Sequence, residues 1–344
     1  MWCFLCLTAY NALFAFQNKE LIVKKYLGTA LTAIIVLTMA ILGFVFAGPN
    51  LTPLQQETLI ILGIICGASA CYCFVVGELA RNNSQMDKLW SLLPIAYAWV
   101  IAGKGGMKPR LVLFAVIVTL WGIRLTINFA RKGAYSIKFW TGEEDYRWAI
   151  LRQRKAFQNR GVWALFDLFF ISIYQNVLIL LICLPALAAM ESNEPLGVID
   201  YVAVFTSLGC LMIETAADEQ QMSFYTTKKK LLAEGRALED LPAPYNKGFN
   251  TTGLWGRARH PNYLGEQGLW ICLYLFAIGA KVTVYGVFHW TILGPMLLVL
   301  LFLGSSSLGE AISSGKYPEY SLYASHVSKY VPLWKYKPEK YQED

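Results

Sequence analysis

The densest cluster of polar residues in this apolar chain is the stretch 253–268, GLWGRARHPNYLGEQG. It carries Arg, His, Asn, Tyr and Glu side chains immediately before an apolar run. Arg side chains grip phosphate through forked N–H donors, and a helix N-terminus adds free backbone N–H groups. The stretch therefore suits an anionic cofactor. The alternative is an anchor at the membrane interface, with Arg and Tyr at headgroup level and Pro261 in the first turn of a helix.

Ionisable side chains also occur inside or at the ends of apolar runs, where an unpaired charge is costly. Such residues are functional candidates, and the alternative for each is a helix-end residue that reaches the interface. Glu214 and Asp218 lie four residues apart and share a helix face, so they need a cation or a hydrogen-bond donor opposite them. The residues of this kind are Glu78, Arg124, Asp167, Glu214, Glu266 and Glu310.

Two further segments combine charges with aromatic rings. Residues 142–155 hold three acids followed by four basic residues, a pattern typical of an amphipathic helix at a membrane surface. In the C-terminal segment, Tyr317, Tyr320 and Tyr323 recur every three residues beside Lys316. This row is typical of an aromatic belt, and it also suits stacking on a nucleotide with the lysine near its phosphates.

These residues must be positioned by membrane helices. The chain is 56% hydrophobic and 15% charged, and its apolar residues form long runs, which predicts an all-α polytopic membrane protein. No GxGxxG motif follows a strand, so no soluble Rossmann domain is expected. We expect a two-helix appendage over 1–56, a seven-helix membrane domain over 57–334 and a tail over 335–344. The nine expected spans are about 2–18, 27–46, 57–80, 89–103, 111–129, 162–189, 198–217, 264–280 and 283–308.

The basic residues are distributed unevenly between these runs. If the N-terminus lies outside and the runs alternate, 25 of the 30 Lys and Arg residues face the cytoplasm and 4 face outward, with Arg124 inside a run. An excess of basic residues in cytoplasmic loops is normal for membrane proteins. The net charge of +7 therefore indicates topology rather than nucleic-acid binding. This topology predicts that residues 253–268 face the cytoplasm.

Cysteine and histidine usage argues against a metal centre. The eight cysteines lie in apolar runs without a CxxC pair, which is typical of small buried side chains. The three histidines, His260, His289 and His326, are far apart, whereas a di-iron membrane hydroxylase needs many clustered His ligands. We therefore expect no bound metal.

The order of motifs resembles a known family. The motifs are DKLW (87–90), LWGIRLTINFARKGAY (120–135), EEDYRW (143–148), IETAADEQQ (213–221), GLWGRARHPNYLGE (253–266) and GEAISSGKYPEY (309–320). This set is similar to the DUF1295 family of membrane proteins, which is related to the C-terminal domain of steroid 5-alpha-reductases and, more distantly, to sterol C14 reductases. The resemblance covers about residues 78–334, and its most specific element is RHPNY followed by Gly265 and Glu266.

The resemblance implies that NADPH binds among helices and loops on the cytoplasmic side. The Lys/Arg-rich surround favours NADPH over NADH because NADPH carries an additional phosphate. The residues implied for the cofactor are Asp218, Arg259, His260, Asn262, Tyr263, Glu266, Tyr317 and Tyr320, with Arg124, Asp145, Arg147, Glu214, Arg257, Glu310 and Lys316 as further candidates.

The chemistry implied by the resemblance is reduction of a carbon–carbon double bond conjugated to a carbonyl in a steroid-like or other lipophilic substrate. A hydride leaves NADPH for the β-carbon, an acid polarises the carbonyl oxygen, and a proton reaches the α-carbon. Glu78, Asp87 and Tyr97 are the candidate catalytic residues, with Trp90 as a cavity wall. The outside loops are short, so the substrate is expected to enter from the bilayer among membrane lipids. The substrate's identity and the oligomeric state stay open.

Two other function classes remain at this point. Isoprenylcysteine and phospholipid methyltransferases, which use S-adenosylmethionine, carry a stretch similar to RHPNY. They typically end with paired acids and a Phe-Gly-x-x-Tyr pattern, whereas this chain has the single acid Glu310 and KYPEY. The motif set therefore favours the reductase. The third class is a membrane scaffold without enzymatic activity.

Overall fold

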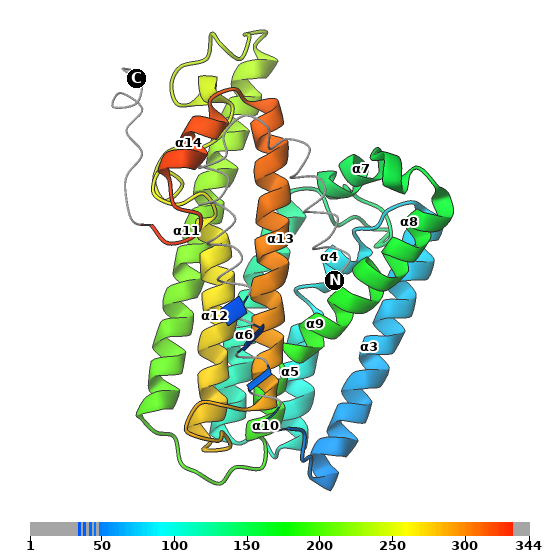
Figure 1. The fold of residues 1–344 in the computed structure, drawn as a ribbon, viewed down its shortest axis with the longest axis vertical. Coiled ribbons are helices and arrows are strands. Elements are labelled where there is room, and N and C mark those ends of the chain that lie inside the picture. The colour runs from blue at the N-terminus through cyan, green and yellow to red at the C-terminus, as the bar shows by residue number, and fades with distance from the viewer. Residues whose placement is uncertain (1–33, 36, 39–40, 43–44, 46–47, 333–344) are drawn as a thin grey trace. The chain divides into compact units, whose positions relative to one another are not determined.

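The structure is a computed structural model that describes residues 34–35, 37–38, 41–42, 45 and 48–332 (Figure 1). Within these residues every regular element is a helix, and the only β-bridges are two isolated ones, Ala258 to Ser328 and Val284 to Phe288. The predicted all-α class is confirmed for the described part of the chain. The expected first span, 2–18, and most of the second, 27–46, lie outside the described residues.

The helices are joined by connections of which the longest are residues 132–145 and the loop 234–260, which contains only one short helical turn. In chain order they are α3 (Pro53–Ala80), α4 (Gln85–Leu89), α5 (Leu93–Lys104), α6 (Pro109–Arg131), α7 (Tyr146–Arg152), η1 (Lys155–Phe157), α8 (Arg160–Phe166), η2 (Asp167–Tyr174), α9 (Gln175–Leu181), α10 (Leu184–Ala189), α11 (Val198–Ala233), η3 (Tyr245–Lys247), α12 (Pro261–Gly279), η4 (Trp290–Ile292), α13 (Leu293–Lys316) and α14 (Tyr320–His326).

Five helical stretches of the described chain are long and apolar enough to cross a membrane, as expected for a multi-pass membrane protein. They are Pro53–Ala80, Pro109–Arg131, Arg160–Ala189, Val198–Ala233 and Trp290–Lys316. The expected number of about nine spans is not confirmed. At about 1.5 Å per residue, the 12 residues of α5 fall well short of a hydrocarbon layer of about 30 Å. Helix α12 begins with polar turns that lower its apolar character.

The third of these stretches, Arg160–Ala189, changes its winding along its length. Helix α8 passes into η2, a π-helix over Asp167–Tyr174, before α9 continues. The rings of Phe166, Phe170 and Tyr174 stack along this segment, with centroids 5.0 and 5.5 Å apart. Because π-helical turns are rare and often mark functional sites, this stretch stands out from the other spans.

The last span begins later than hydropathy predicts. The expected span was 283–308, but residues 284–288 form a tight turn closed by the bridge between Val284 and Phe288. Tyr285 and Gly286 both have positive φ angles, which a continuous α-helix does not allow. Helix α13 therefore runs from Leu293 to Lys316 and carries Glu310 within its last two turns.

The described chain divides into two compact units by its internal contacts. Unit 1 contains residues 208–269 and 299–332, and unit 2 contains residues 34–207 and 270–298, within the described part of the chain. Most of the residues implied for the cofactor fall in unit 1, whereas the three candidate catalytic residues fall in unit 2.

A buried ion pair joins several segments of unit 2. Arg110 of α6 donates from Nε and Nη2 to the two carboxylate oxygens of Asp200 at 2.7 and 2.9 Å. The same guanidinium donates to the carbonyl oxygens of Glu194, Pro195 and Gly279. Asp200 has no exposed surface, so its charge depends on this arginine.

Replacing Arg110 with Met is expected to destabilise the protein by about 3–5 kcal/mol because it leaves the Asp200 carboxylate buried without its partner. Thermal unfolding of the purified protein in detergent measures the effect. The control is Lys104→Ala, which removes an exposed ion pair with Glu57 and should cost about 0–1 kcal/mol. Equal losses in the two variants would contradict the role assigned to Arg110.

Candidate functional site

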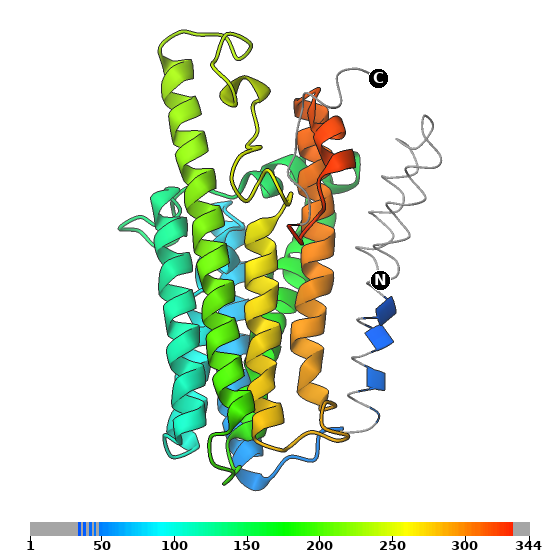
Figure 2. The same cartoon turned by 90° about the vertical axis from the view of Figure 1, so that its left-hand side faces the viewer.

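The polar stretch identified from the sequence leads into α12, which begins at Pro261. Within unit 1, α12 lies side by side with α11 (Figure 2). A Cβ atom on Gly265 would lie 2.6 Å from Cβ of Glu214 and 2.8 Å from the carbonyl oxygen of Cys210. A Cβ on Gly268 would lie 2.7 Å from the Cys210 sulfur. The two glycines therefore let the backbones of α11 and α12 approach closely. This approach fixes how near the polar side chains of one helix lie to those of the other.

This close approach brings an amide of α12 to an acid of α11. Asn262 donates from Nδ2 to Oδ1 of Asp218 at 3.1 Å, while its Oδ1 accepts from the Tyr263 amide at 3.0 Å. Glu214, one turn earlier on α11, and Glu266, one turn later on α12, are both buried. The structure thus gathers four of the predicted cofactor residues on two adjacent helices.

A second polar group centres on Glu310 of α13, which is only 1% exposed. Its Oε1 lies 3.0 Å from Nε of Arg259 and 2.9 Å from Nε2 of His260. Burial lowers the pKa of His260 in spite of the neighbouring carboxylate, which favours a neutral imidazole at neutral pH. A carboxylate paired with Arg259 accepts hydrogen bonds only, so Nε2 of the neutral ring carries the proton.

The C-terminal segment of unit 1 holds this group in place. The backbone N–H groups of Arg259 and His260 donate to the carbonyl oxygens of Ser328 and Lys329, both at 2.9 Å. The Arg259 guanidinium also donates to the Ala324 carbonyl oxygen. Tyr263 stacks on His260 with centroids 5.2 Å apart. The site is therefore built from α11, α12, α13 and the segment after α14.

The tyrosine row of the C-terminal segment turns inward. Tyr317, Tyr320 and Tyr323 are buried and pack around Phe249, with centroid distances of 5.0 to 5.8 Å. Lys228 of α11 donates to the Gly248 carbonyl oxygen at 2.6 Å and lies over the Tyr317 ring. The row thus supports the loop before α12, and its predicted stacking on a nucleotide stays a prediction. Arg257 and Lys316, also predicted cofactor residues, are exposed.

In unit 2 the Asp-Tyr-Arg motif forms the start of α7. Asp145 caps this helix by accepting from the Arg147 amide, and its carboxylate pairs with the Arg147 guanidinium at 2.8 and 2.9 Å. Asp87 accepts from Nε1 of Trp148 at 3.0 Å. Burial and then the charge of Asp145 raise the pKa of Asp87, while Arg147 outweighs burial and lowers the pKa of Asp145. Two nearby carboxyl groups therefore differ in their affinity for a proton.

The other predicted residues of unit 2 occupy different places. Burial lowers the pKa of Lys132, and the nearby positive charges of Arg124 and Arg147 lower it further. Tyr97 of α5 is completely buried, and its hydroxyl lies beside the thiol of Cys66 without a well-aligned hydrogen bond within the described chain. Glu78 lines a cavity with the basic residues Arg81, Arg152 and Arg160. No sequence pattern groups these arginines, because they lie in or next to three separate helices.

Two tryptophan donors were also missed from the sequence. Nε1 of Trp121 and Nε1 of Trp270 are buried without a partner within the described residues, and their rings meet edge to face at 5.0 Å. Both tryptophans lie in apolar runs, where a tryptophan is expected to be a packing residue. Nothing in the neighbouring sequence indicates that its N–H group lacks a partner. Among the described residues, no group of three or more His, Cys, Asp or Glu side chains could hold a metal ion.

Comparison with known proteins places these residues in a wider context. Residues 73–328 match the model of the family described as DUF1295, a protein of unknown function. The chain is 36% identical over 267 residues to an uncharacterized protein of Schizosaccharomyces pombe, a match that covers 75% of this chain and 74% of that protein. No solved structure matches the chain. Residues 257–266, 214–218 and 310–320 all lie within the matched range.

Replacing Gly265 with Ala is expected to force α12 away from α11 and to lengthen the contact between Asn262 and Asp218. Overpacking of this kind costs about 1–3 kcal/mol. Thermal unfolding in detergent measures the loss of stability. Gly304→Ala is the matched control, because no atom lies within 4 Å of a Cβ built on this helical glycine of the same unit. A Gly265 variant as stable as this control would refute the proposed close approach.

The carboxyl pair of unit 2 predicts opposite effects of two conservative changes. Asp87→Asn should stabilise the protein at pH 7, because it removes a negative charge that the folded state disfavours. This gain in stability should vanish as the pH falls toward the unfolded-state pKa of aspartate, about 3.9. Asp145→Asn should destabilise the protein at pH 7 and lose this effect as pH falls through the lowered pKa of Asp145. Melting temperatures between pH 4 and pH 8 test both, and effects of the same sign would contradict this account.

Proposed function

Because the chain belongs to the DUF1295 family, whose description assigns no activity, we propose its function from the residues and their geometry. The proposed activity is NADPH-dependent reduction of a carbon–carbon double bond conjugated to a carbonyl in a lipophilic substrate. The observation that carries the proposal is the convergence in unit 1. There, the pair Asp218–Asn262 and the group Glu310–Arg259–His260 lie at the start of one helix.

The chemistry of this convergence suits a nicotinamide nucleotide. Buried carboxylates, an amide and Nδ1 of the neutral His260 ring can accept hydrogen bonds from ribose hydroxyls and from the carboxamide, while the second N–H of the Asn262 amide adds a donor. The exposed Arg257 and Lys316 supply positive charge for phosphates at the edge of the unit. On this proposal the site faces the cytoplasm, where NADPH is available and where charge counting predicts residues 253–268 to lie.

Unit 2 supplies candidates for the acid that the reaction needs. A buried Tyr hydroxyl normally has a strong hydrogen-bond partner, whereas the Tyr97 hydroxyl has the weakly polar thiol of Cys66 beside it. This hydroxyl could donate to the carbonyl oxygen of a substrate and stabilise the developing enolate. Asp87, with its raised pKa, is a second candidate acid. NADPH would supply the hydride, and these residues would orient the substrate and hold the proton.

The proposal includes a seven-helix membrane domain, with α5 and α12 crossing the bilayer beside the five long spans. Short helices can cross where the bilayer thins or where flanking residues reach the interface. Exposed apolar side chains on α6, such as Leu120, Ile123 and Ile127, would then face lipid. A lipophilic substrate would reach the interior sideways from the bilayer.

One observation supports a second candidate, a methyltransferase that uses S-adenosylmethionine. Glu214, Glu266 and Glu310 are three buried acids of unit 1, and carboxylates also suit the positive sulfonium and ammonium groups of this cofactor. The two proposals differ in ligand charge, so a binding experiment separates them.

We expect purified protein to bind NADPH, with a change in its fluorescence and a rise in melting temperature, and not to bind S-adenosylmethionine. His260→Ala and Asn262→Ala should each weaken NADPH binding at least about tenfold, because each removes a partly buried hydrogen-bonding group. Asn193→Ala, on an exposed loop of unit 2, is the matched control and should bind normally.

Binding of S-adenosylmethionine alone would move the assignment to methyl transfer. Binding of neither ligand would favour a scaffold. NADPH binding unchanged in both variants would reject the site proposed in unit 1.

A further inference from the structure

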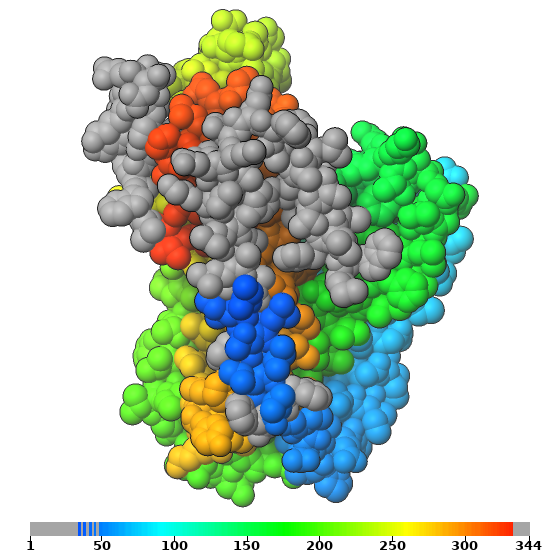
Figure 3. Space-filling model, viewed as in Figure 1, coloured from blue at the N-terminus to red at the C-terminus, as the bar shows by residue number. Residues whose placement is uncertain are grey.

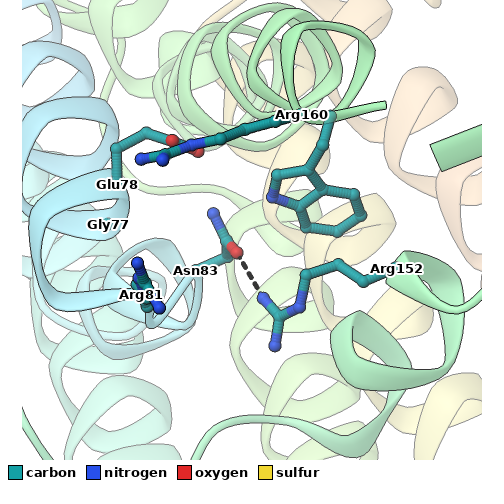
Figure 4. Close-up of a pocket in the computed structure, with 7 residues that line it drawn as sticks. Gly77, Glu78, Arg81, Asn83, Arg152 and Arg160 are labelled. Carbon is teal, nitrogen blue, oxygen red and sulfur yellow. Dashed lines mark hydrogen bonds between the residues drawn. The ribbon is translucent and has the colours of Figure 1, made fainter. Parts of the chain in front are cut away.

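A cavity of about 490 Å³ opens in unit 2 where α3 ends and α8 begins (Figure 4). It lies far along the chain from the polar stretch before α12 and belongs to the other unit. A volume of this size is typical of small-molecule sites. Its lining residues are Gly77, Glu78, Arg81, Asn83, Arg152, Arg160 and Trp163.

The arginines of this cavity are held in different ways. Arg152 is fixed, because it donates to Asn83 Oδ1 at 2.7 Å, pairs with Glu144 and lies over the Trp163 ring. Arg81 and Arg160 make no ion pair within the described part of the chain. Glu78 lies beside Arg160 in Figure 4 and also contacts the buried carboxyl of Asp167. Arg81 and Arg160 are therefore the cationic groups that this cavity offers to an anion.

Asn83 places a further donor at the cavity. It is 3% exposed, and its Nδ2 lies near the buried carboxyl of Asp167 without a well-aligned hydrogen bond. In Figure 4 this amide projects into the space between Glu78, Arg160 and Arg152, while its oxygen accepts from Arg152. An acceptor in the cavity would give Nδ2 a well-aligned partner.

The backbone at Arg81 is also unusual. Arg81 caps the C-terminus of α3 in the left-handed conformation with φ of 51°, a position that normally carries Gly or Asn. A long side chain in this conformation strains the backbone. The strain is explained if the guanidinium is needed at the cavity.

We propose that this cavity binds the phosphodiester group of a monoanionic membrane phospholipid. Arg81 and Arg160 would grip the phosphate oxygens, Asn83 would donate a further hydrogen bond, and Glu78 would accept from a headgroup hydroxyl. The phosphodiester would supply the anionic partner that Arg81 and Arg160 have nowhere else in the described part of the chain. A headgroup with an additional ammonium would bring a further positive charge to a cavity that already holds three arginines.

The surroundings favour a lipid over a soluble phosphate. The cavity lies at the ends of two stretches that can cross a membrane, Pro53–Ala80 and Arg160–Ala189, which are side by side in Figure 3. Apolar side chains near it are exposed on both: Leu79 of α3 is 81% exposed, and Leu165 and Phe169 are 58% and 61% exposed. Acyl chains could therefore lie along these faces while the headgroup occupies the cavity.

Native mass spectrometry of the full chain, with phosphatidylglycerol and phosphatidylcholine titrated in detergent, tests the proposal. One phosphatidylglycerol should bind preferentially. Arg81→Gln with Arg160→Gln should weaken its binding at least about tenfold. The matched control is Lys138→Gln with Lys155→Gln, two exposed residues outside the cavity that remove the same charge and should bind normally.

Asn83→Asp sharpens the test, because it keeps the oxygen that accepts from Arg152 and places a negative charge where the phosphate is expected. It should abolish preferential binding while the melting temperature of the delipidated protein stays within a few degrees of the original. Equal affinity for both lipids, or equal losses in the control, would overturn the proposal. Glycerophosphoglycerol is the soluble phosphodiester that corresponds to phosphatidylglycerol. If it competed as well as the lipid does, the ligand would be a soluble phosphodiester and the lipid assignment would be overturned.

Discussion

A carboxylate in a water-poor interior must have an opposite charge beside it, and this requirement organises unit 1. Glu310 has almost no exposed surface, and Arg259 and His260 meet it on one side. The same arginine binds the carbonyl oxygen of Ala324, so helix α13, the entry to α12 and the C-terminal segment are held together. Breaking one partner of such a group is strongly destabilising. The geometry around Asn262 is therefore set by the fold before any ligand arrives.

Part of this arrangement could be predicted from the sequence, because its signals are local. Polar density before an apolar run and Pro261 in a first helical turn both appear within one short stretch. The pairing of His260 with Glu310 joins residues 50 positions apart, which no periodicity encodes. The regular tyrosine row was visible, but spacing alone does not say whether a face points inward, and these rings pack on Phe249.

Hydropathy predicted the helical class but misplaced the start of the last span. Residues 284–288 are apolar enough for a span, but their positive φ angles make a turn, so α13 starts later than expected. The cavity between α3 and α8 was not foreseen, because Arg81, Arg152 and Arg160 are scattered along the chain and resemble ordinary basic residues of membrane-flanking loops. Only the three-dimensional fold brings them together.

The central claim, that the protein transfers hydride from NADPH to a conjugated double bond, is tested most directly by isotope transfer. Purified protein in lipid nanodiscs would be supplied with NADPH carrying deuterium at C4 and with a panel of lipophilic enones. The account predicts a saturated product with one deuterium on the β-carbon, formed by the original protein and lost in the Asn262→Ala variant. Transfer of a methyl group from S-adenosylmethionine to a lipophilic acceptor, with no deuterium transfer, would contradict it.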